Sequence, residues 1–208
     1  MKITLEQLQQ RLSNLNTLQI TADQDQLGKR IVTENPDQLT PAGVLVPLVN
    51  RPVNGRDNLH VLLTKRASHL KHHPGQVSFP GGRQETTDQD LIDTALRETF
   101  EEIGIDNNLI TILAELPKHQ TISGYLMCPF VGIVSNNYSL TIDRSEVDSA
   151  FEVPLDFICD SSNHQLNSAV YNGERRHFYS MQYQQHYIWG ATARVLVEFS
   201  NRVILASD

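Results

Sequence analysis

A rigid turn that leads directly into an amphipathic helix constrains the fold of this chain more than any other feature. The stretch reads FPGGRQETTDQDLIDTALRETFEEIG and runs from Phe79 to Gly104. Proline restricts the backbone and glycine permits conformations closed to other residues, so such a turn is sharply defined. Over 90–103 the side chains that suit a core recur at helical spacing, which predicts a helix with one buried face. These residues are Leu91, Ile92, Ala95, Leu96, Thr99 and Ile103.

The same helix carries three carboxylates. Glu98, Glu101 and Glu102 stand at i, i+3 and i+4, so we expect them to share a second face about 100° wide. Arg97 precedes Glu101 by four residues and offsets part of their repulsion. One interpretation is a solvated acidic surface. The other is a cation site, because Mg²⁺ takes oxygen ligands and commonly uses one or two carboxylates plus substrate phosphates. Periodicity alone does not decide between them.

The rest of the chain predicts a single domain, 1–208, of the α/β class, or α+β in some schemes. Thr4 and Gln7 fit a capping box for an N-terminal helix over about 4–15, and a C-terminal helix is expected over about 190–205. The polar stretch 20–42 is expected to be a loop. Apolar runs and turn residues predict a short helix at 154–159, a hairpin at 175–188, and strands at 43–49, 59–64, 76–79, 109–115, 128–134 and 138–142.

Composition excludes several classes of protein. Hydrophobic residues make up 39% of the 208 and charged residues 20%, which is typical of a globular domain. The formal net charge of −7 argues against a nucleic-acid-binding protein, which needs a basic surface. Because no stretch approaches the roughly 20 apolar residues of a membrane span, and the N-terminus lacks an apolar leader, we expect a cytoplasmic protein. Cys128 and Cys159 form no CxxC pair, and both are expected to be buried as small hydrophobic side chains.

With its flanking residues, the acidic helix resembles a known motif. Gly82 to Ile105 is similar to the Nudix box, Gx5Ex7REUxEExGU, where U is a bulky apolar residue. The end matches closely as RETFEEIGI, with Thr99 at the first U. The start departs from the pattern, because the distance from Gly82 to Arg97 is one residue longer. Gln89 stands eight residues before Arg97, and Asp88 stands six after Gly82, so Asp88 is a candidate for the upstream acid.

A second motif narrows the resemblance. Residues 62–82 read LLTKRASHLKHHPGQVSFPGG and are similar to the element LLTxR[SA]x3Rx3Gx3FPGG of coenzyme A pyrophosphatases. Only Lys71 differs at a fixed position, where that subfamily has arginine. FEVPLDF (151–157) and IWGATA (188–193) also resemble the subfamily. The resemblance extends from about Gly43 to Phe199.

The resemblance implies a Nudix-type α/β/α sandwich with a mixed β-sheet and hydrolysis of a pyrophosphate bond dependent on Mg²⁺ or Mn²⁺. It implies that Glu98 and Glu102 are metal ligands and that Glu101 is a third ligand or orients water. The Gly81 carbonyl is a further candidate ligand. Arg97 is expected to orient a glutamate of the helix, and either Glu98 or Glu101 to accept a proton from water.

The second motif supplies cations for an anionic substrate. Lys65, Arg66, Lys71 and Arg83 are candidate phosphate-binding residues, the alternative being solvated loop cations. Lysine at position 71 keeps the charge of arginine and loses its bidentate geometry. The resemblance implies that the substrate is coenzyme A or a derivative, cleaved to 4′-phosphopantetheine and adenosine 3′,5′-bisphosphate. Two alternatives stay open: hydrolysis of another nucleoside diphosphate derivative such as ADP-ribose or an oxidised nucleotide, and a non-catalytic nucleotide-binding or CoA-binding module.

Other polar and aromatic residues are assigned structural roles. His72 and His73 are adjacent, so they cannot both face one ion in a regular strand, and we expect them to be polar loop residues. Tyr187 and Trp189 are expected to be core or hairpin residues rather than a platform for adenine. The expected partner is a small-molecule substrate, with no nucleic acid or membrane, and both a monomer and a homodimer are compatible with the sequence.

Overall fold

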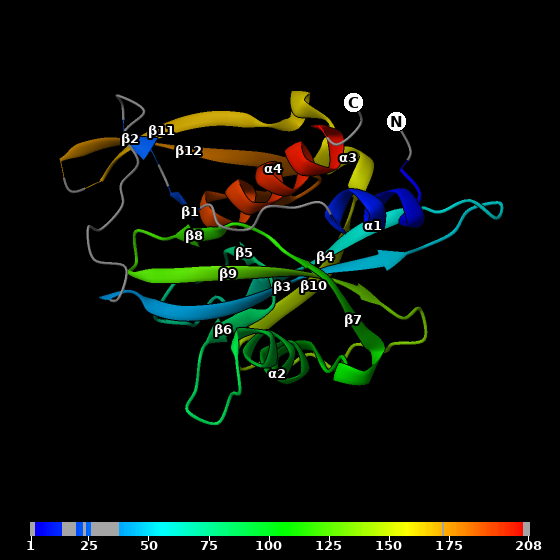
Figure 1. Cartoon of the computed structure of the whole chain (residues 1–208). Coiled ribbons are helices and arrows are strands. Elements are labelled where there is room, and N and C mark those ends of the chain that lie inside the picture. The colour runs from blue at the N-terminus through cyan, green and yellow to red at the C-terminus, as the bar shows by residue number, and fades with distance from the viewer. Residues whose placement is uncertain (1–2, 14–19, 23, 26–37, 172, 206–208) are drawn as a thin grey trace.

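Two β-sheets form the framework of the protein (Figure 1). The structure, a computed structural model, describes residues 3–13, 20–22, 24–25, 38–171 and 173–205. In the larger sheet the main strand order is β1-β8-β9-β3-β4-β10, while β5 pairs with β4, β6 with β3 and β7 with β9. Its strands are β1 (Ile20–Ala22), β3 (Thr40–Asn50), β4 (Leu59–Arg66), β5 (Val77–Ser78), β6 (Gly81–Arg83), β7 (Ile110–Glu115), β8 (Lys118–Gln120), β9 (Tyr125–Val134) and β10 (Val147–Pro154).

The smaller sheet has the order β11-β12-β13, and β2 also pairs with β12. Its strands are β2 (Gln24–Asp25), β11 (Gln165–Tyr171), β12 (Glu174–Tyr183) and β13 (His186–Trp189). The helices are α1 (Leu5–Ser13), α2 (Leu91–Ile103), α3 (Leu155–Cys159) and α4 (Gly190–Leu205), with short 3₁₀ turns η2 (Asn107–Leu109) and η3 (Ser161–Asn163).

Helices cover both faces of the larger sheet. Figure 1 shows α2 below this sheet, α1, α3 and α4 above it, and β11 and β12 beyond α4. Strands β3 and β9 run parallel, from the pair Thr40 and Tyr125 to the pair Val49 and Val134, while β4 is antiparallel to both β3 and β10. The sheet is therefore mixed, and the predicted α/β/α sandwich is confirmed.

Strand β3 places α2 because it is buried on both faces. Alternate side chains of a strand point to opposite faces. Val46 accordingly belongs to the large core cluster that includes Phe199 of α4, whereas Leu45 clusters with Ala95 of α2. Gly43 lets the helix approach closely, since a Cβ atom there would lie 2.2 Å from the carbonyl oxygen of Leu91. Helix α2 thus packs directly on the β3 backbone.

Two expectations about irregular segments need correction. The predicted strand at 138–142 is wrong, because the backbone N–H of Thr141 donates to Ile103 O (2.9 Å) and that of Asp143 to Glu102 O (3.0 Å), at the end of α2. This segment supplies donors to a helix terminus instead of pairing with a strand. The expected loop over 20–42 contains β1, β2 and the start of β3, and its residues 26–37 lie outside the described part.

The N-terminal helix begins with the predicted capping box. The Thr4 N–H donates to Gln7 Oε1 (3.0 Å), and the Gln7 N–H donates to Thr4 Oγ1 (3.2 Å). Residues 14 and 15 of the expected helix lie outside the described residues. Cys128 is buried, Cys159 is partly buried, and both are free thiols. Among the helices that the structure describes, none combines the length and the apolar character needed to cross a membrane.

Candidate active site at the turn before helix α2

Helix α2 has well-defined ends. It begins after Asp90, whose carboxylate accepts a hydrogen bond from the Asp93 N–H at 2.8 Å, and it ends at Gly104, whose N–H donates to Phe100 O at 2.8 Å. Gly104 has a φ of 74°, the left-handed conformation that glycine adopts at the ends of helices. Thr99 occupies the position where the Nudix box has a bulky apolar residue. It is buried and donates its hydroxyl to Ala95 O at 2.6 Å.

The three glutamates of α2 lie in different environments. Glu102 is buried on the face that meets the sheet, and the side chain of Glu98 is 17% exposed. Glu101 points outward, with 55% of its side chain exposed. The structure therefore brings Glu98 and Glu102 inward, while Glu101 stays at the rim.

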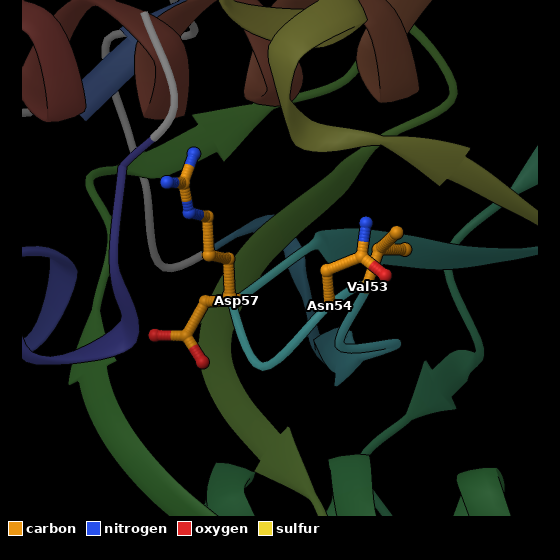
Figure 2. A pocket seen from close by; sticks show the side chains of 4 residues that line it. Val53, Asn54 and Asp57 are labelled. Carbon is orange, nitrogen blue, oxygen red and sulfur yellow. The ribbon is translucent and has the colours of Figure 1, made fainter.

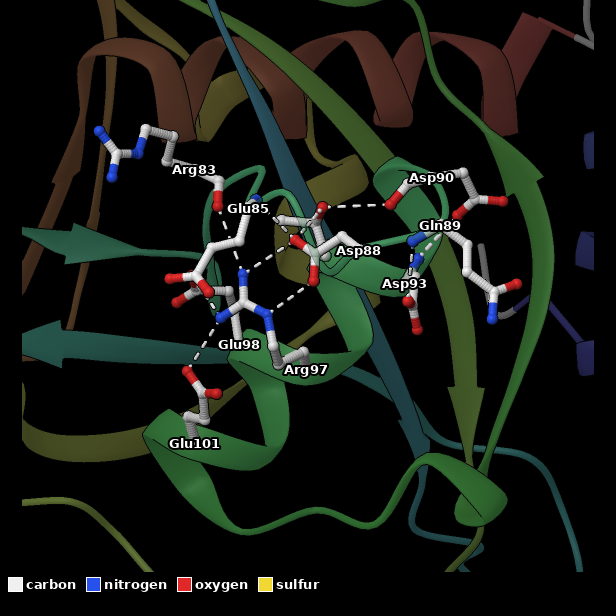
Figure 3. Close-up of polar contacts among 10 residues, drawn as sticks. Arg83, Glu85, Asp88, Gln89, Asp90, Asp93, Arg97, Glu98 and Glu101 are labelled. Atoms are coloured by element: carbon white, nitrogen blue, oxygen red, sulfur yellow. Dashed lines mark hydrogen bonds and ion pairs between the residues drawn. The ribbon is translucent and has the colours of Figure 1, made fainter.

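Arg97 organises the irregular start of the motif (Figure 3). Its Nε donates to Asp88 Oδ1 at 2.8 Å and one terminal nitrogen donates to Asp88 Oδ2 at 3.0 Å, which is a bidentate pair. Asp88 also accepts from the Glu85 N–H and the Thr94 hydroxyl, and only 2% of its side chain is exposed. The hydrogen bonds from Arg97 hold the pKa of Asp88 well below its usual range. Asp88 is thus engaged with Arg97, and Gln89 donates its N–H to Asp93 at 3.1 Å.

Arg97 also contacts two of the three glutamates. Its other terminal nitrogen lies 3.0 Å from Glu98 Oε1 and 3.0 Å from Glu101 Oε2. The Arg83 carbonyl accepts from Arg97 at 3.3 Å, so the turn and the helix are joined through one guanidinium group. Arg97 is thus placed to orient two glutamates of the helix, and that role stays a prediction.

Glycines of the turn make room for the inward carboxylates. A Cβ atom on Gly82 would lie 2.4 Å from Oε1 of Glu98, so this carboxylate fits only against a residue without a side chain. The backbone amide of Gly81 lies near Glu102 and lowers the pKa of its carboxyl group. The amide near Glu102 leaves the Gly81 carbonyl as a candidate metal ligand, which stays a prediction.

Burial perturbs both inward carboxylates. Burial raises the pKa of Glu102 to about 8, against the lowering effect of the nearby Arg66 charge. Oε2 of Glu102 has no hydrogen-bond partner although it is buried. Burial also raises the pKa of Glu98, and Arg97 opposes that shift. A buried oxygen without a partner is costly, and it marks a position that a cation would satisfy.

Among the candidate phosphate-binding residues, Arg66 lies nearest to the carboxylates. It stands at the end of β4, its charge acts on Glu102, and its buried Nε has no hydrogen-bond partner. Lys65 Nζ lies 3.4 Å from Asp148 Oδ2. Lys71 is exposed on the loop after β4, and Figure 3 shows the Arg83 side chain pointing away from Arg97. The structure therefore joins Arg66 to the site and leaves Lys71 and Arg83 at the surface.

The sequence analysis missed Glu146. Strand β10 pairs with β4 so that Val147 is opposite Arg66, which brings the preceding residue to the site. The charge of Glu146 contributes to the raised pKa of both Glu98 and Glu102. No spacing rule links a residue before β10 to a helix more than 40 positions earlier. The one sequence signal for Glu146 was its position as an acidic residue directly before strand β10.

The donors fit a partly formed cation site. In the part of the chain that the structure describes, no three His, Cys, Asp or Glu side chains are arranged so that they alone could hold a metal ion. Glu98 and Glu102, with the unpartnered oxygen of Glu102, are hard oxygen donors. Mg²⁺ is often held by one or two carboxylates, with water and substrate phosphates completing its coordination. The residues present fit that mode of binding.

The other residues singled out in the sequence lie on a loop and on a hairpin strand. His73 hydrogen-bonds to Gln76 Oε1 at 3.0 Å within the loop, as expected of a polar loop residue. Trp189 and Tyr187 are both partly exposed on the hairpin strand β13, and Trp189 packs edge-on against Phe178.

Residues within the described part of the chain line two of the surface cavities. One, of about 480 Å³, adjoins the outer side of α2 and is lined by Thr87, Asp88, Asp93, Arg97, Phe100, Asp106 and Asn107. The other, of about 440 Å³, lies at the tip of the β3–β4 hairpin beside Val53, Asn54, Arg56 and Asp57 (Figure 2). Asp57 there accepts from the Leu5 N–H at 2.8 Å and so anchors α1. Because Asp57 beside the hairpin cavity holds the start of α1, we place the candidate site instead at the carboxylates of α2.

Comparison with known proteins identifies the family. The profile of the NUDIX domain matches residues 40–168, more than half of the chain. The Nudix hydrolase NudL of Enterobacter sp. (strain 638) is 36% identical over 162 residues, which cover 78% of this chain and 82% of that protein. NudL of Photorhabdus laumondii is also 36% identical over 162 residues, covering 78% and 84%. Neither name states a substrate.

Solved structures with a similar fold include a binary complex of the C. elegans Ap4A hydrolase. It has a TM-score of 0.46 and 19% identity, and the match covers 57% of this chain and 82% of that chain. A MutT/nudix family protein from Enterococcus faecalis has a TM-score of 0.49 and 14% identity, covering 85% and 65%. The domain match and the identity to the NudL proteins show that the chain belongs to the Nudix family and is a Nudix hydrolase.

Proposed function

We propose that this Nudix hydrolase cleaves the pyrophosphate bond of coenzyme A and its derivatives with the help of Mg²⁺ or Mn²⁺. Water would add across the phosphoric anhydride and give 4′-phosphopantetheine, or its acyl form, and adenosine 3′,5′-bisphosphate. The observation that carries this proposal is the nearness of Arg66, from the segment that resembles coenzyme A pyrophosphatases, to the buried Glu102, whose pKa its charge lowers.

The acidic side of the site is suited to a divalent cation. Glu98 and Glu102 would hold the ion, with Glu101 and the Gly81 carbonyl as further candidates and Glu146 as an additional nearby charge. When bound, such an ion neutralises charge on phosphate oxygens and makes water a better nucleophile. The unpartnered oxygen of Glu102 supports this assignment because it would gain a partner.

The protein residues divide the remaining tasks. Arg97 positions Glu98 through the 3.0 Å contact while it is itself held by Asp88. Glu98 is the better candidate to accept a proton from water, because it lies inward, whereas Glu101 is mostly exposed. Such a proton transfer needs a group within hydrogen-bonding distance of the water.

The basic side of the site is suited to a substrate with several phosphates. Coenzyme A carries a pyrophosphate and a 3′-phosphate, and Arg66 stands beside the carboxylates while Lys71 is exposed on the following loop. Lys65 and Arg83 are further candidates for phosphate contacts. Opposite charges near a site raise the local concentration of an anionic substrate.

Product analysis tests this function directly. Incubation of the purified protein with coenzyme A and Mg²⁺ or Mn²⁺ should yield the two named products in mass spectrometry, with one ¹⁸O incorporated from labelled water. The absence of products from coenzyme A and from every acyl-CoA tested would exclude the proposal. A higher kcat/KM for ADP-ribose or an oxidised nucleotide would instead select the alternative that lysine at position 71 leaves open.

Two matched variants test whether the protein itself, and not a contaminating enzyme, catalyses the turnover. Glu98→Gln keeps the shape of the side chain and removes its charge, so turnover should fall by a factor on the order of 10³ or more. Glu6→Gln makes the same chemical change on the exposed surface of α1 and should leave turnover unchanged. Equal rates in the two variants would contradict the assignment of Glu98.

A further inference from the structure

The segment 141–146 connects the end of helix α2 to the loop between β4 and β5, residues 67–76, which we call the basic loop. At its start, Thr141 donates its N–H to Ile103 O at 2.9 Å, and Asp143 donates its N–H to Glu102 O at 3.0 Å. The segment is therefore bonded to the backbone of one of the two inward glutamates. A shift of the segment would be transmitted directly to that residue.

The segment is tightly folded between its two ends. The Asp143 carboxylate accepts from both the N–H and the hydroxyl of Ser145, each at 2.8 Å. The Glu146 N–H donates to Asp143 O at 3.1 Å. Such side-chain to backbone bonds are typical of Asx turns and fix the local backbone. The position of Glu146 therefore depends on where the whole turn is held.

The basic loop holds the other end of this turn. The Ala67 N–H donates to Glu146 O at 2.8 Å. His69 Nε2 lies 3.1 Å from Ser145 O, and because a carbonyl oxygen only accepts, Nε2 must carry the hydrogen. Of these two contacts, the one from His69 is made by a side chain. In the sequence His69 stands between Arg66 and Lys71, two candidates for binding the substrate. One imidazole thus joins the loop that would bind the anion to the turn that carries Glu146.

We propose that His69 is a positioning residue, whose hydrogen bond to Ser145 holds the turn at 143–146. That turn carries the backbone of Glu146, and its Asp143 N–H is bonded to the carbonyl oxygen of Glu102. This inference rests on the proposed function insofar as it takes Glu98 and Glu102 to hold the metal ion, with Glu146 as an additional nearby charge. It adds that hydrogen bonds join the loop after β4 to the turn beside the carboxylates. Loss of the His69 side chain, which would contact neither metal nor phosphate, should therefore weaken metal binding.

The test compares His69→Ala with His69→Gln. The glutamine amide can donate to Ser145 O in place of the imidazole, whereas alanine cannot. The first measurement is Mn²⁺ affinity, titrated without substrate by the electron paramagnetic resonance signal of free Mn²⁺. Residues that orient metal ligands typically contribute about 10- to 100-fold in affinity or activity. We expect a loss of about tenfold or more in His69→Ala and recovery of most of it in His69→Gln.

Kinetics distinguish positioning from general loosening of the loop. Because Arg66 and Lys71 are unchanged, His69→Ala should lower kcat by about tenfold or more and change KM less. His72→Ala is the matched control, since His72 is exposed on the same loop and makes no hydrogen bond within the described residues. We expect His72→Ala to bind Mn²⁺ and turn over substrate like the wild-type protein. A rise in KM alone in His69→Ala would assign His69 to substrate binding and overturn the proposal.

A double-mutant cycle ties the effect to Glu146. If His69 acts through Glu146, then His69→Ala should add little to the loss of Mn²⁺ affinity already caused by Glu146→Gln, because effects in a shared network are not additive. Additive losses, wild-type affinity in His69→Ala, or failure of His69→Gln to restore it would each overturn the proposal. Since Mn²⁺ is titrated without substrate, failure of the protein to cleave coenzyme A would reject the proposed function alone.

Discussion

The carboxyl group of Glu102 is buried without a partner for one oxygen, and this makes the stability of the metal-free protein depend on pH. Burial raises its pKa from 4.5 to about 8. Between these two values the unfolded chain releases this proton while the folded protein retains it, so rising pH favours unfolding. The contribution of Glu102 to stability is therefore fully present below pH 4.5 and is lost as the pH rises towards about 8.

We expect Tm, measured in EDTA, to fall for the wild-type protein from about pH 5 to pH 8 relative to Glu102→Gln, which cannot ionise. Saturating Mn²⁺ should remove much of the difference, because a cation stabilises the charged form of the carboxylate. Parallel pH profiles for the two proteins in EDTA would contradict the buried state of Glu102.

Gly82 allows the Glu98 carboxylate to lie against the turn. A Cβ atom at position 82 would lie 2.4 Å from both Cδ and Oε1 of Glu98. The flexible end of Glu98 would move, and the backbone would stay in place. Displacement of a catalytic group by about 1 Å can cost on the order of 100-fold in rate. We therefore expect Gly82→Ala to lower kcat by about 10- to 100-fold with Tm nearly unchanged, and a large drop in Tm would show that the backbone had moved instead.

The end of helix α2 is a junction between elements. Gly104 has a φ of 74°, and a Cβ atom there would lie 2.7 Å from the Cβ and 3.0 Å from the carbonyl oxygen of Thr141. Since part of this obstacle is backbone, Gly104→Ala should destabilise the protein by about 2–3 kcal/mol, through both the strained φ and the clash.

The matched control for this junction is Gly124→Ala. Gly124 has a φ of 86°, and nothing lies within 4 Å of the Cβ that alanine would add, so only the backbone cost of about 1 kcal/mol applies. Urea unfolding of both variants measures the difference. Equal losses of stability would mean that the contact between α2 and the 141–146 segment contributes nothing.

Elements with strong local signals could be predicted from the sequence, whereas their connections could not. Periodicity predicted α2 as 90–103 and the structure has Leu91–Ile103, because the buried stripe and the glycine after it act locally. The 138–142 segment alternates like a strand, but its backbone donors bind the end of α2, a tertiary contact that no local pattern records. Strand β10 was not predicted, and with it Glu146 was missed.

The site shows the same division. Spacing placed Gln89 where the motif has an acid and left Asp88 as the candidate, since a loop has no period that fixes where its side chains point. The structure pairs Asp88 with Arg97 and turns Gln89 towards Asp93. The helix carboxylates were predicted together, but their separation into inward Glu98 and Glu102 and outward Glu101 depends on how α2 packs against β3.

In the whole molecule, the layer that contains α1 lies on the opposite face of the larger sheet from α2 (Figure 1). The β3–β4 hairpin holds the start of α1, because Asp57 accepts from the Leu5 N–H at 2.8 Å and from Asn50 Nδ2 at 2.7 Å. The other side of α1 is tied to α4, since Arg11 donates to the Val203 carbonyl. These contacts stabilise a layer that includes none of the residues proposed to bind metal or substrate.

Asp57→Ala therefore separates stability from activity. Loss of an acceptor at the start of a helix costs about 1–2 kcal/mol, and the Leu5 N–H and the Asn50 amide would both lose their partner. We expect a lower Tm for Asp57→Ala, with kcat, KM and Mn²⁺ affinity equal to those of the wild-type protein at a temperature where both are folded. Circular dichroism melts and steady-state kinetics measure the two properties on the same preparation. A fall in kcat at saturating Mn²⁺ would show that the helical layer acts on the site through the sheet, and would contradict the independence of the two faces.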